Sequence, residues 1–91
     1  MNEELNKRIG ALIRQKRKEK GINQAQLGEM IGLSRTSVVN IEQGTQQLTI
    51  ENLYLFAQKM DCSVYSLLPD TKPKIRLKLV RESVVVGIAL A

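Results

Sequence analysis

The 91-residue sequence has no histidine and only one cysteine, Cys62. Without histidine, no Ser-His or Cys-His nucleophile pair can form, and neither a histidine-containing nor a multi-cysteine zinc site is possible. A phosphate-binding glycine motif is also missing, and the acidic side chains are dispersed along the chain. We therefore expect a protein that is not an enzyme and that binds no metal and no cofactor.

The single cysteine and the lack of long apolar segments indicate the cellular compartment in which the protein acts. Cys62 cannot form an internal disulfide, which fits a reducing compartment. The only continuous apolar stretch is residues 84–91, far short of the ~20 residues that a membrane helix needs. The N-terminus does not show the charged-then-apolar pattern of a signal peptide. The sequence predicts a cytoplasmic protein with no membrane partner.

Positive charge is in excess and unevenly distributed. The net charge is +5 and the pI is about 9.7, which fits a polyanionic partner. Residues 1–69 hold nine basic and seven acidic side chains, whereas residues 70–91 hold five and two. We expect residues 1–69 to form the folded domain and residues 70–91 to form a linker and tail. Binding by the mildly basic domain then depends on where individual charges are placed.

The segment 23–44 is the most informative part of the chain. Asn23 is a good N-cap for a helix that runs to about Ile31, and Gly32 has the backbone freedom needed to end it. The apolar residues that we expect this helix to bury are Ala25, Leu27 and Ile31. The short turn after Gly32 then joins it to a second helix.

The second helix begins after Ser34, which is also a good N-cap. Val38 and Ile41 give it a narrow apolar stripe, and the rest of its surface is small and polar. Such a surface suits the DNA major groove, where Arg pairs with guanine, Asn with adenine, and the Thr methyl with that of thymine. The alternative is a generic helical hairpin whose polar residues face solvent. On the DNA interpretation, the base-contacting residues are Arg35, Thr36, Ser37 and Asn40.

Contacts to the DNA backbone are expected on both sides of this helix. The side-chain amide of Gln24 can bond a phosphate, which the helix dipole also favours. Gly44 is expected in a left-handed conformation, with the amides around it available to phosphate. An ordinary helix-ending loop is the alternative there. The residues assigned to backbone contacts are Asn23, Gln24, Gln43, Gly44, Thr45 and Gln46.

Apolar periodicity predicts three further helices. The first runs from about Glu3 to Lys20, and another follows the N-cap Thr49. A short fifth helix from Val64 to Leu68 follows. Pro69 ends it.

Residues from about Ile9 to Leu68 resemble the helix-turn-helix domain shared by phage repressors, Cro proteins and the xenobiotic-response-element regulators. The resemblance rests on the spacing of the paired helices, on Ile41-Glu42-Gln43-Gly44 and on Ile50-Glu51-Asn52-Leu53. It implies a DNA-binding domain in which Arg17 and Glu42 form a buried ion pair between the first and third helices. We therefore expect a mainly α protein, a five-helix repressor-like domain with a C-terminal β-strand or hairpin tail.

The tail differs in character from the domain. Residues 74–79 alternate basic and apolar side chains, with the period of a half-buried strand. Residues 84–91 are apolar and nearly uncharged, and such a strand would aggregate if left at an edge. Its partner is the preceding strand, the same tail of a second subunit, or another protein. We expect tails to pair across a homodimer, through Ile75, Leu77, Leu79, Val84, Val86 and Ile88.

These features predict a regulator of transcription that binds double-stranded DNA in a sequence-specific way. We expect a dimeric repressor of a near-palindromic operator, whose half-sites lie about one DNA turn, ~34 Å, apart. The main alternative is an antitoxin-like autoregulator. In that case the C-terminal tail binds a partner protein while the helices bind the promoter of their own operon.

Overall fold

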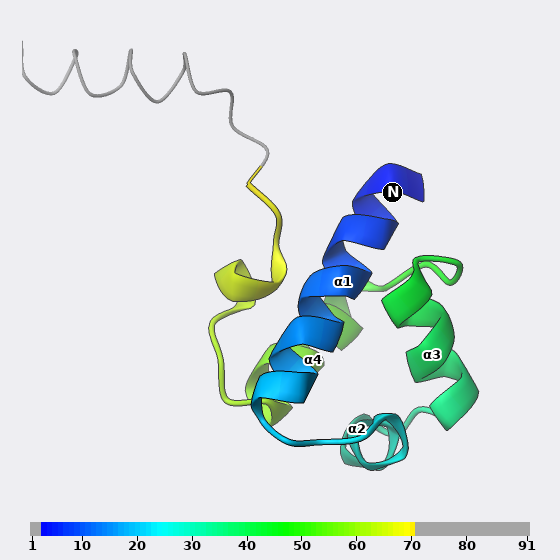
Figure 1. The fold of residues 1–91 in the computed structure, drawn as a ribbon, viewed down its shortest axis with the longest axis vertical. Helices are drawn as coiled ribbons and strands as arrows, with labels where there is room; N and C mark the ends of the chain where they lie inside the picture. Colours follow the sequence, from blue (N-terminus) through cyan, green and yellow to red (C-terminus); the bar gives the residue numbers. More distant parts are fainter. Residues whose placement is uncertain (1–2, 71–91) are drawn as a thin grey trace, which may run out of the picture.

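The order of elements follows the predicted helices, with one change at the end. The computed structural model describes residues 3–70. Its elements are α1 (Glu3–Glu19), α2 (Gln24–Ile31), α3 (Arg35–Gln43), α4 (Ile50–Lys59) and the 3-10 helix η1 (Val64–Leu67). In Figure 1, α1 lies between α3 on one side and η1 on the other. The predicted tail residues 71–91 lie outside the described residues, so their strand and its pairing stay a prediction.

Side-chain caps fix where the helices begin, as the sequence predicted. Asn23 Oδ1 accepts the Gln26 backbone N–H at 2.8 Å, and Gln26 Oε1 accepts the Asn23 N–H at 2.9 Å, which makes a capping box. Ser34 caps α3 and Thr49 caps α4 in the same manner, each accepting the N–H three residues on. These bonds satisfy N–H groups that the helices cannot pair internally.

The expected fifth α-helix is a single 3-10 turn, so the prediction of five α-helices is wrong in this detail. Pro69 disfavours helical geometry at Leu68, which has φ −105° and ψ 132°. The segment is closed by bonds of the 3-10 type, from Ser66 N to the Ser63 carbonyl at 3.0 Å and from Leu68 N to the Tyr65 carbonyl at 3.2 Å. Only four residues fit between the Ser63 cap and the extended Leu68.

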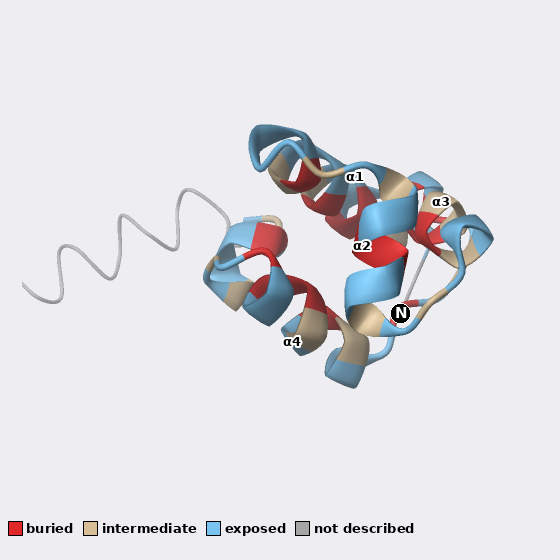
Figure 2. Ribbon diagram, turned by 90° about the horizontal axis from the view of Figure 1, so that it is seen from below, coloured by how far each residue is buried: buried red, intermediate tan, exposed pale blue. Residues whose placement is uncertain are grey.

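The core is built from the inward faces of all five elements and the loop before α4. Figure 2 shows buried segments of the helices turned towards one another and exposed segments on the outside. The buried apolar residues are Ile9, Ile13, Leu27, Val38, Ile41, Leu48, Leu53, Phe56, Ala57, Met60 and Leu67. Ala25, which we expected in this core, is exposed, and Ile31 is half-buried. The eight-residue α2 packs through a narrow strip at Leu27 and Gly28.

Close contact between α1 and α3 depends on two glycines. A Cβ atom on Gly10 would collide with the Ile41 carbonyl oxygen and lie 2.6 Å from that of Glu42. Gly44 has φ +79°, and a Cβ there would lie 2.6 Å from Lys7 Cα. Backbone atoms cannot swing aside as the end of a side chain can. The sequence therefore sets the distance between these helices at two points.

The variant Gly10→Ala tests this close contact. Helix propensity alone would stabilise the protein by about 1 kcal/mol. We expect instead a net loss of about 1–3 kcal/mol, because the new methyl group meets backbone oxygens. Urea denaturation followed by circular dichroism measures the change. The exposed neighbour Ala11, changed to Gly, measures the propensity term in the same helix. A stabilised Gly10→Ala protein would contradict the packing account.

Candidate nucleic-acid interface

A tight turn sets α3 against α2. Gly32 has φ 76°, and its N–H donates to the Gly28 carbonyl, which also accepts the Leu33 N–H at 2.8 Å. A Cβ on Gly28 would lie 2.5 Å from the Leu33 carbonyl oxygen. The turn therefore needs a small residue inside α2 as well as a left-handed residue after it. This geometry brings Ser34 to the position from which α3 begins.

The outward surface of α3 carries polar side chains that have no bonding partner among residues 3–70. Arg35 and Thr36 are exposed and Asn40 is half-buried, while Val38 and Ile41 face the core. Over residues 3–70, the side chains of Arg35, Thr36 and Asn40 make no hydrogen bond or ion pair. Ser37 differs, because its hydroxyl accepts a bond from Ser34 Oγ at 3.2 Å. Three side chains of α3 are thus available to another molecule with their full bonding capacity.

A buried ion pair joins α1 to α3. Arg17 Nε lies 2.6 Å from Glu42 Oε2, and Arg17 Nη2 lies 3.1 Å from Glu42 Oε1. The side chains are 10% and 2% exposed. Arg17 Nη1 donates to the Ile22 carbonyl at 2.9 Å, so each guanidinium nitrogen has a partner. The resemblance implied a buried ion pair between Arg17 and Glu42, and the structure gives it bidentate geometry.

Gln24 extends this pair to α2. Its Nε2 donates to Glu42 Oε1 at 3.1 Å, so the carboxylate accepts bonds from two residues. We expected the Gln24 amide to be available to phosphate, and one of its N–H groups is instead used inside the protein. The backbone N–H groups of Gln24 and Ala25 have no acceptor in the described part of the chain. They are the free donors at the start of α2.

The loop after α3 uses its amides to end the helix. The N–H groups of Gly44, Thr45 and Gln46 donate to the carbonyls of Ile41 and Asn40 at 3.1, 2.9 and 3.3 Å. Thr45 Oγ1 also donates to the Asn40 carbonyl, at 3.2 Å. The amides that we expected to bond phosphate are therefore engaged. Gln43, which is exposed, and the half-buried Gln46 offer side-chain amides there instead.

Two basic residues of α1 lie beside this surface, although the sequence favours a solvated face for the basic residues of this helix, with only a few of them along the phosphate backbone. Arg14 lines an open polar cleft whose other lining residues are Arg17, Asn23, Gln24, Ala25 and Arg35. It also lies with Gln24 and Gln43 in an adjoining cleft. Lys7 lies against Gly44, at the far end of α3. The sequence spacing could have indicated these two residues. Arg14 lies one turn before Arg17 and seven residues after Lys7, so the three residues lie near one side of the helix.

Other kinds of site are missing from residues 3–70. No group of three histidine, cysteine, aspartate or glutamate side chains there is placed to hold a metal ion. No helix in this range is long and apolar enough to cross a membrane.

A family model described as helix-turn-helix matches residues 13–67 of this chain. The chain belongs to this family. Its members are DNA-binding transcription regulators of the Cro/C1 type, and the family is not one of enzymes, in agreement with the sequence prediction.

Individual relatives agree with this assignment. The chain is 47% identical over 38 residues to the ImmF control region 10 kDa protein of Bacillus phage phi105, and the match covers 42% of each chain. It is 35% identical to the P22 c2 repressor protein, whose crystal structure contains a synthetic operator (TM-score 0.61, covering 66% of this chain and 91% of that one). It is 27% identical to the restriction-modification controller protein C.AhdI from Aeromonas hydrophila (TM-score 0.66, covering 68% and 90%).

Removing one partner of the Arg17–Glu42 pair tests how much the domain depends on it. We expect Arg17→Met to destabilise the protein by about 3–5 kcal/mol, because a buried carboxylate loses its cation. The double variant Arg17→Met/Glu42→Leu should recover much of this loss, since no buried charge remains. Urea denaturation of the three proteins gives both values.

The exposed pair Lys16–Glu19, 3.4 Å apart on one face of α1, provides the control. Glu19→Gln should change stability by less than about 0.5 kcal/mol. A similar small effect for Arg17→Met would show that the buried pair does not hold the domain together.

Proposed function

We propose that this protein is a sequence-specific, dimeric repressor that occupies a near-palindromic operator. The observation that carries the proposal is the free polar surface of α3, where Arg35, Thr36 and Asn40 have no partner within residues 3–70. A polar side chain without a partner on a rigid, capped helix is suited to a ligand that supplies the missing bonds. Exposed base edges in the major groove supply such bonds.

Each residue of this surface has a distinct part in the proposal. Arg35 makes two parallel bonds to guanine, and Asn40 makes two to adenine. The Thr36 methyl touches a thymine methyl, and Ser37 contacts a base edge through its hydroxyl. Arg35 and Thr36 lie in the first turn of α3 and Asn40 in the second. The N-terminal part of a recognition helix is the part that meets base edges.

The DNA backbone is held on both sides of α3. At the start of α2, the free N–H groups of Gln24 and Ala25 meet one phosphate, with Asn23 and Arg14 beside them. At the other end, the loop from Gln43 through Gly44 and Thr45 to Gln46 meets a second phosphate. Its contacts come from the side chains of Gln43 and Gln46 and from Lys7. These contacts set the register in which α3 lies in the groove.

We propose a homodimer because the apolar tail needs a partner and because repressors of this type meet two half-sites. The tail residues assigned to the dimer contact are Ile75, Leu77, Leu79, Val84, Val86 and Ile88. Two sources support a repressor: the P22 c2 protein, which carries that name and was crystallised with an operator, and the phage control-region relative. We place its action in the cytoplasm, where bacterial DNA lies.

Arg35→Ala tests base recognition. We expect specific binding to weaken by about 1–3 kcal/mol and the preference at one base pair to relax. Selection of bound sequences from a random pool, with the wild type in parallel, identifies that base pair. Arg35→Lys keeps the charge without the planar pair of donors, so it should relax the same position. An equal loss of affinity for all sequences would place Arg35 on a phosphate.

Arg14→Ala tests the proposed phosphate contact. Each lost phosphate contact lowers the slope of log Kobs against log salt concentration by about 1, and affinity should fall to a similar degree for operator and random DNA. Fluorescence anisotropy at several salt concentrations measures both. Lys59→Ala removes the same charge from the exposed end of α4 and should leave the slope unchanged. An unchanged slope for Arg14→Ala would remove this residue from the interface.

A further inference from the structure

An apolar groove lies on the side of α1 that faces away from α3. Leu5 and Ile9 of α1, with Leu53 of α4, line its floor. Its volume is about 450 Å³. Figures 1 and 2 both place η1, which forms part of its wall, on the opposite side of α1 from α3. A partner in this groove would therefore leave the DNA surface free.

The rim of the groove exposes large apolar side chains. Tyr65 is 80% exposed, Ile50 74%, Tyr54 59% and Leu68 38%. Among residues 3–70, Met30 on α2 is the only other exposed large apolar residue, with an exposed fraction of 37%. Four such side chains around one hollow are an exposed apolar patch of the kind that marks an interaction site.

The chain itself carries a segment whose chemistry fits this groove. Residues 84–91 have no charge, and in an extended conformation their side chains alternate in size. The larger Val84, Val86, Ile88 and Leu90 share one face, and Val85, Gly87, Ala89 and Ala91 share the other. Docking of the larger face would cover the rim. The same contact would remove an aggregation-prone segment from water.

Charge supports the same occupant. Five basic residues and one acidic residue lie between position 71 and the apolar segment. Glu4 precedes the groove residue Leu5, and Glu51 follows Ile50. Neither carboxylate forms an ion pair within residues 3–70. Because both carboxylates are exposed, their negative charge favours a basic segment such as the one that precedes residues 84–91 over an acidic partner.

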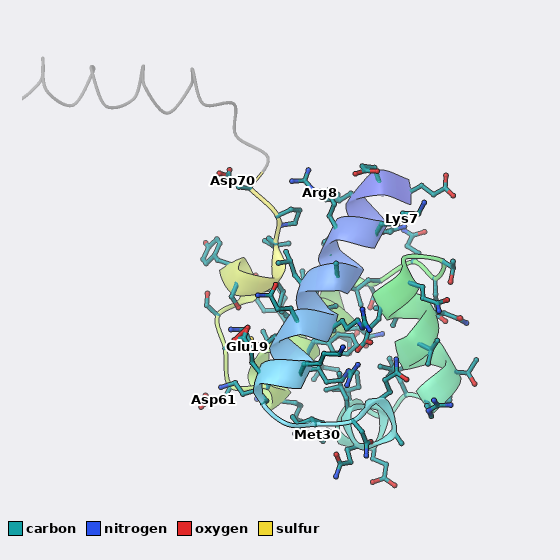
Figure 3. The ribbon with its side chains drawn as sticks, in the orientation of Figure 1. Lys7, Arg8, Glu19, Met30, Asp61 and Asp70 are labelled. Carbon is teal, nitrogen blue, oxygen red and sulfur yellow. The ribbon has the colours of Figure 1, made fainter. Side chains whose placement is uncertain are left out.

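The described part of the chain ends close to the groove. Arg8 Nη2 donates to the Asp70 carbonyl at 3.4 Å, and Figure 3 shows both residues at this end of the molecule. Pro69 lines the groove, and together with Asp70 it also lies beside Arg8 and Leu12. The described chain therefore ends at the edge of the groove.

We propose that residues 84–91 of one protomer dock in the apolar groove of a second copy, and that the exchange is reciprocal. The inference rests on the proposed dimer, and it names the surface that the dimer uses. A two-fold exchange places each tail against the other protomer's α1, α4 and η1. Both α3 helices stay uncovered. The dimer is then held by two equivalent contacts, and each consists of one groove and one tail.

A complementation experiment with the full-length chain tests this arrangement. The groove variant is Tyr54→Lys/Tyr65→Lys, and the tail variant is Val86→Asp/Ile88→Asp. Each variant alone should dimerise at least about tenfold more weakly than the wild type by sedimentation equilibrium, because both of its contacts carry a buried charge. An equimolar mixture should dimerise more tightly than either variant. The groove variant's tail then meets an intact groove on its partner.

Controls separate folding, DNA binding and association. Met30→Lys adds a charge at an exposed apolar residue outside the groove and should leave the dimer unchanged. Circular dichroism shows whether the groove variant is folded, which we expect because Tyr54 and Tyr65 are exposed. Binding of the wild-type chain to a single half-site tests the proposed function by itself. If the wild-type chain does not bind DNA while complementation is intact, the proposed function is overturned and the groove assignment stands.

Three results would overturn the exchange. If only the tail variant dimerises more weakly than the wild type, the tails pair with each other and the groove has no part. If both variants dimerise more weakly and their mixture dimerises no better than either alone, the groove and the tail do not meet between copies. If the wild-type chain stays monomeric at all concentrations, the tail either docks in its own groove or binds another protein.

Discussion

The bidentate bond between Arg17 and Glu42 is the interaction on which the rest of the structure depends. It is the point where three helices meet, because Gln24 of α2 donates to the same carboxylate. Burying two charges is costly unless their polar atoms have partners, and here the Ile22 carbonyl accepts a bond from the third guanidinium nitrogen. The two parallel bonds also fix how the carboxylate is oriented relative to the planar guanidinium.

The close contact of α1 and α3 has a consequence for the proposed DNA surface. Gly10 and Gly44 let the backbone of α1 approach the C-terminal end of α3 closely. Basic residues on that edge of α1, Lys7 and Arg14, are therefore brought beside the ends of α3. The proposed DNA surface thus includes residues of a helix that lies far from α3 in the sequence.

Local rules made the helix boundaries predictable, whereas tertiary packing limited the rest. A cap at Asn23, Ser34 or Thr49 depends on residues three positions apart, so the sequence displays it directly. The segment Val64–Leu67 is a 3-10 turn because Ser63 begins it and Pro69 keeps Leu68 extended, which leaves only four residues between them. Apolar periodicity does not reveal this limit. The exposure of Ala25 depends on which strip of α2 meets α3 and α4. Likewise, the backbone N–H groups of residues 44–46 donate to carbonyls at the end of α3, which the sequence alone does not show.

The side chains that we propose for DNA recognition differ from those that hold α3 in place. The helix is held through Ser34, Val38, Ile41, Glu42 and Gly44, and within residues 3–70 the side chains at positions 35, 36 and 40 form no hydrogen bond or ion pair. Those three positions can therefore change without loss of the scaffold. Paralogues that arise by duplication could acquire new target sequences through a few substitutions and regulate different genes in one cell without cross-talk.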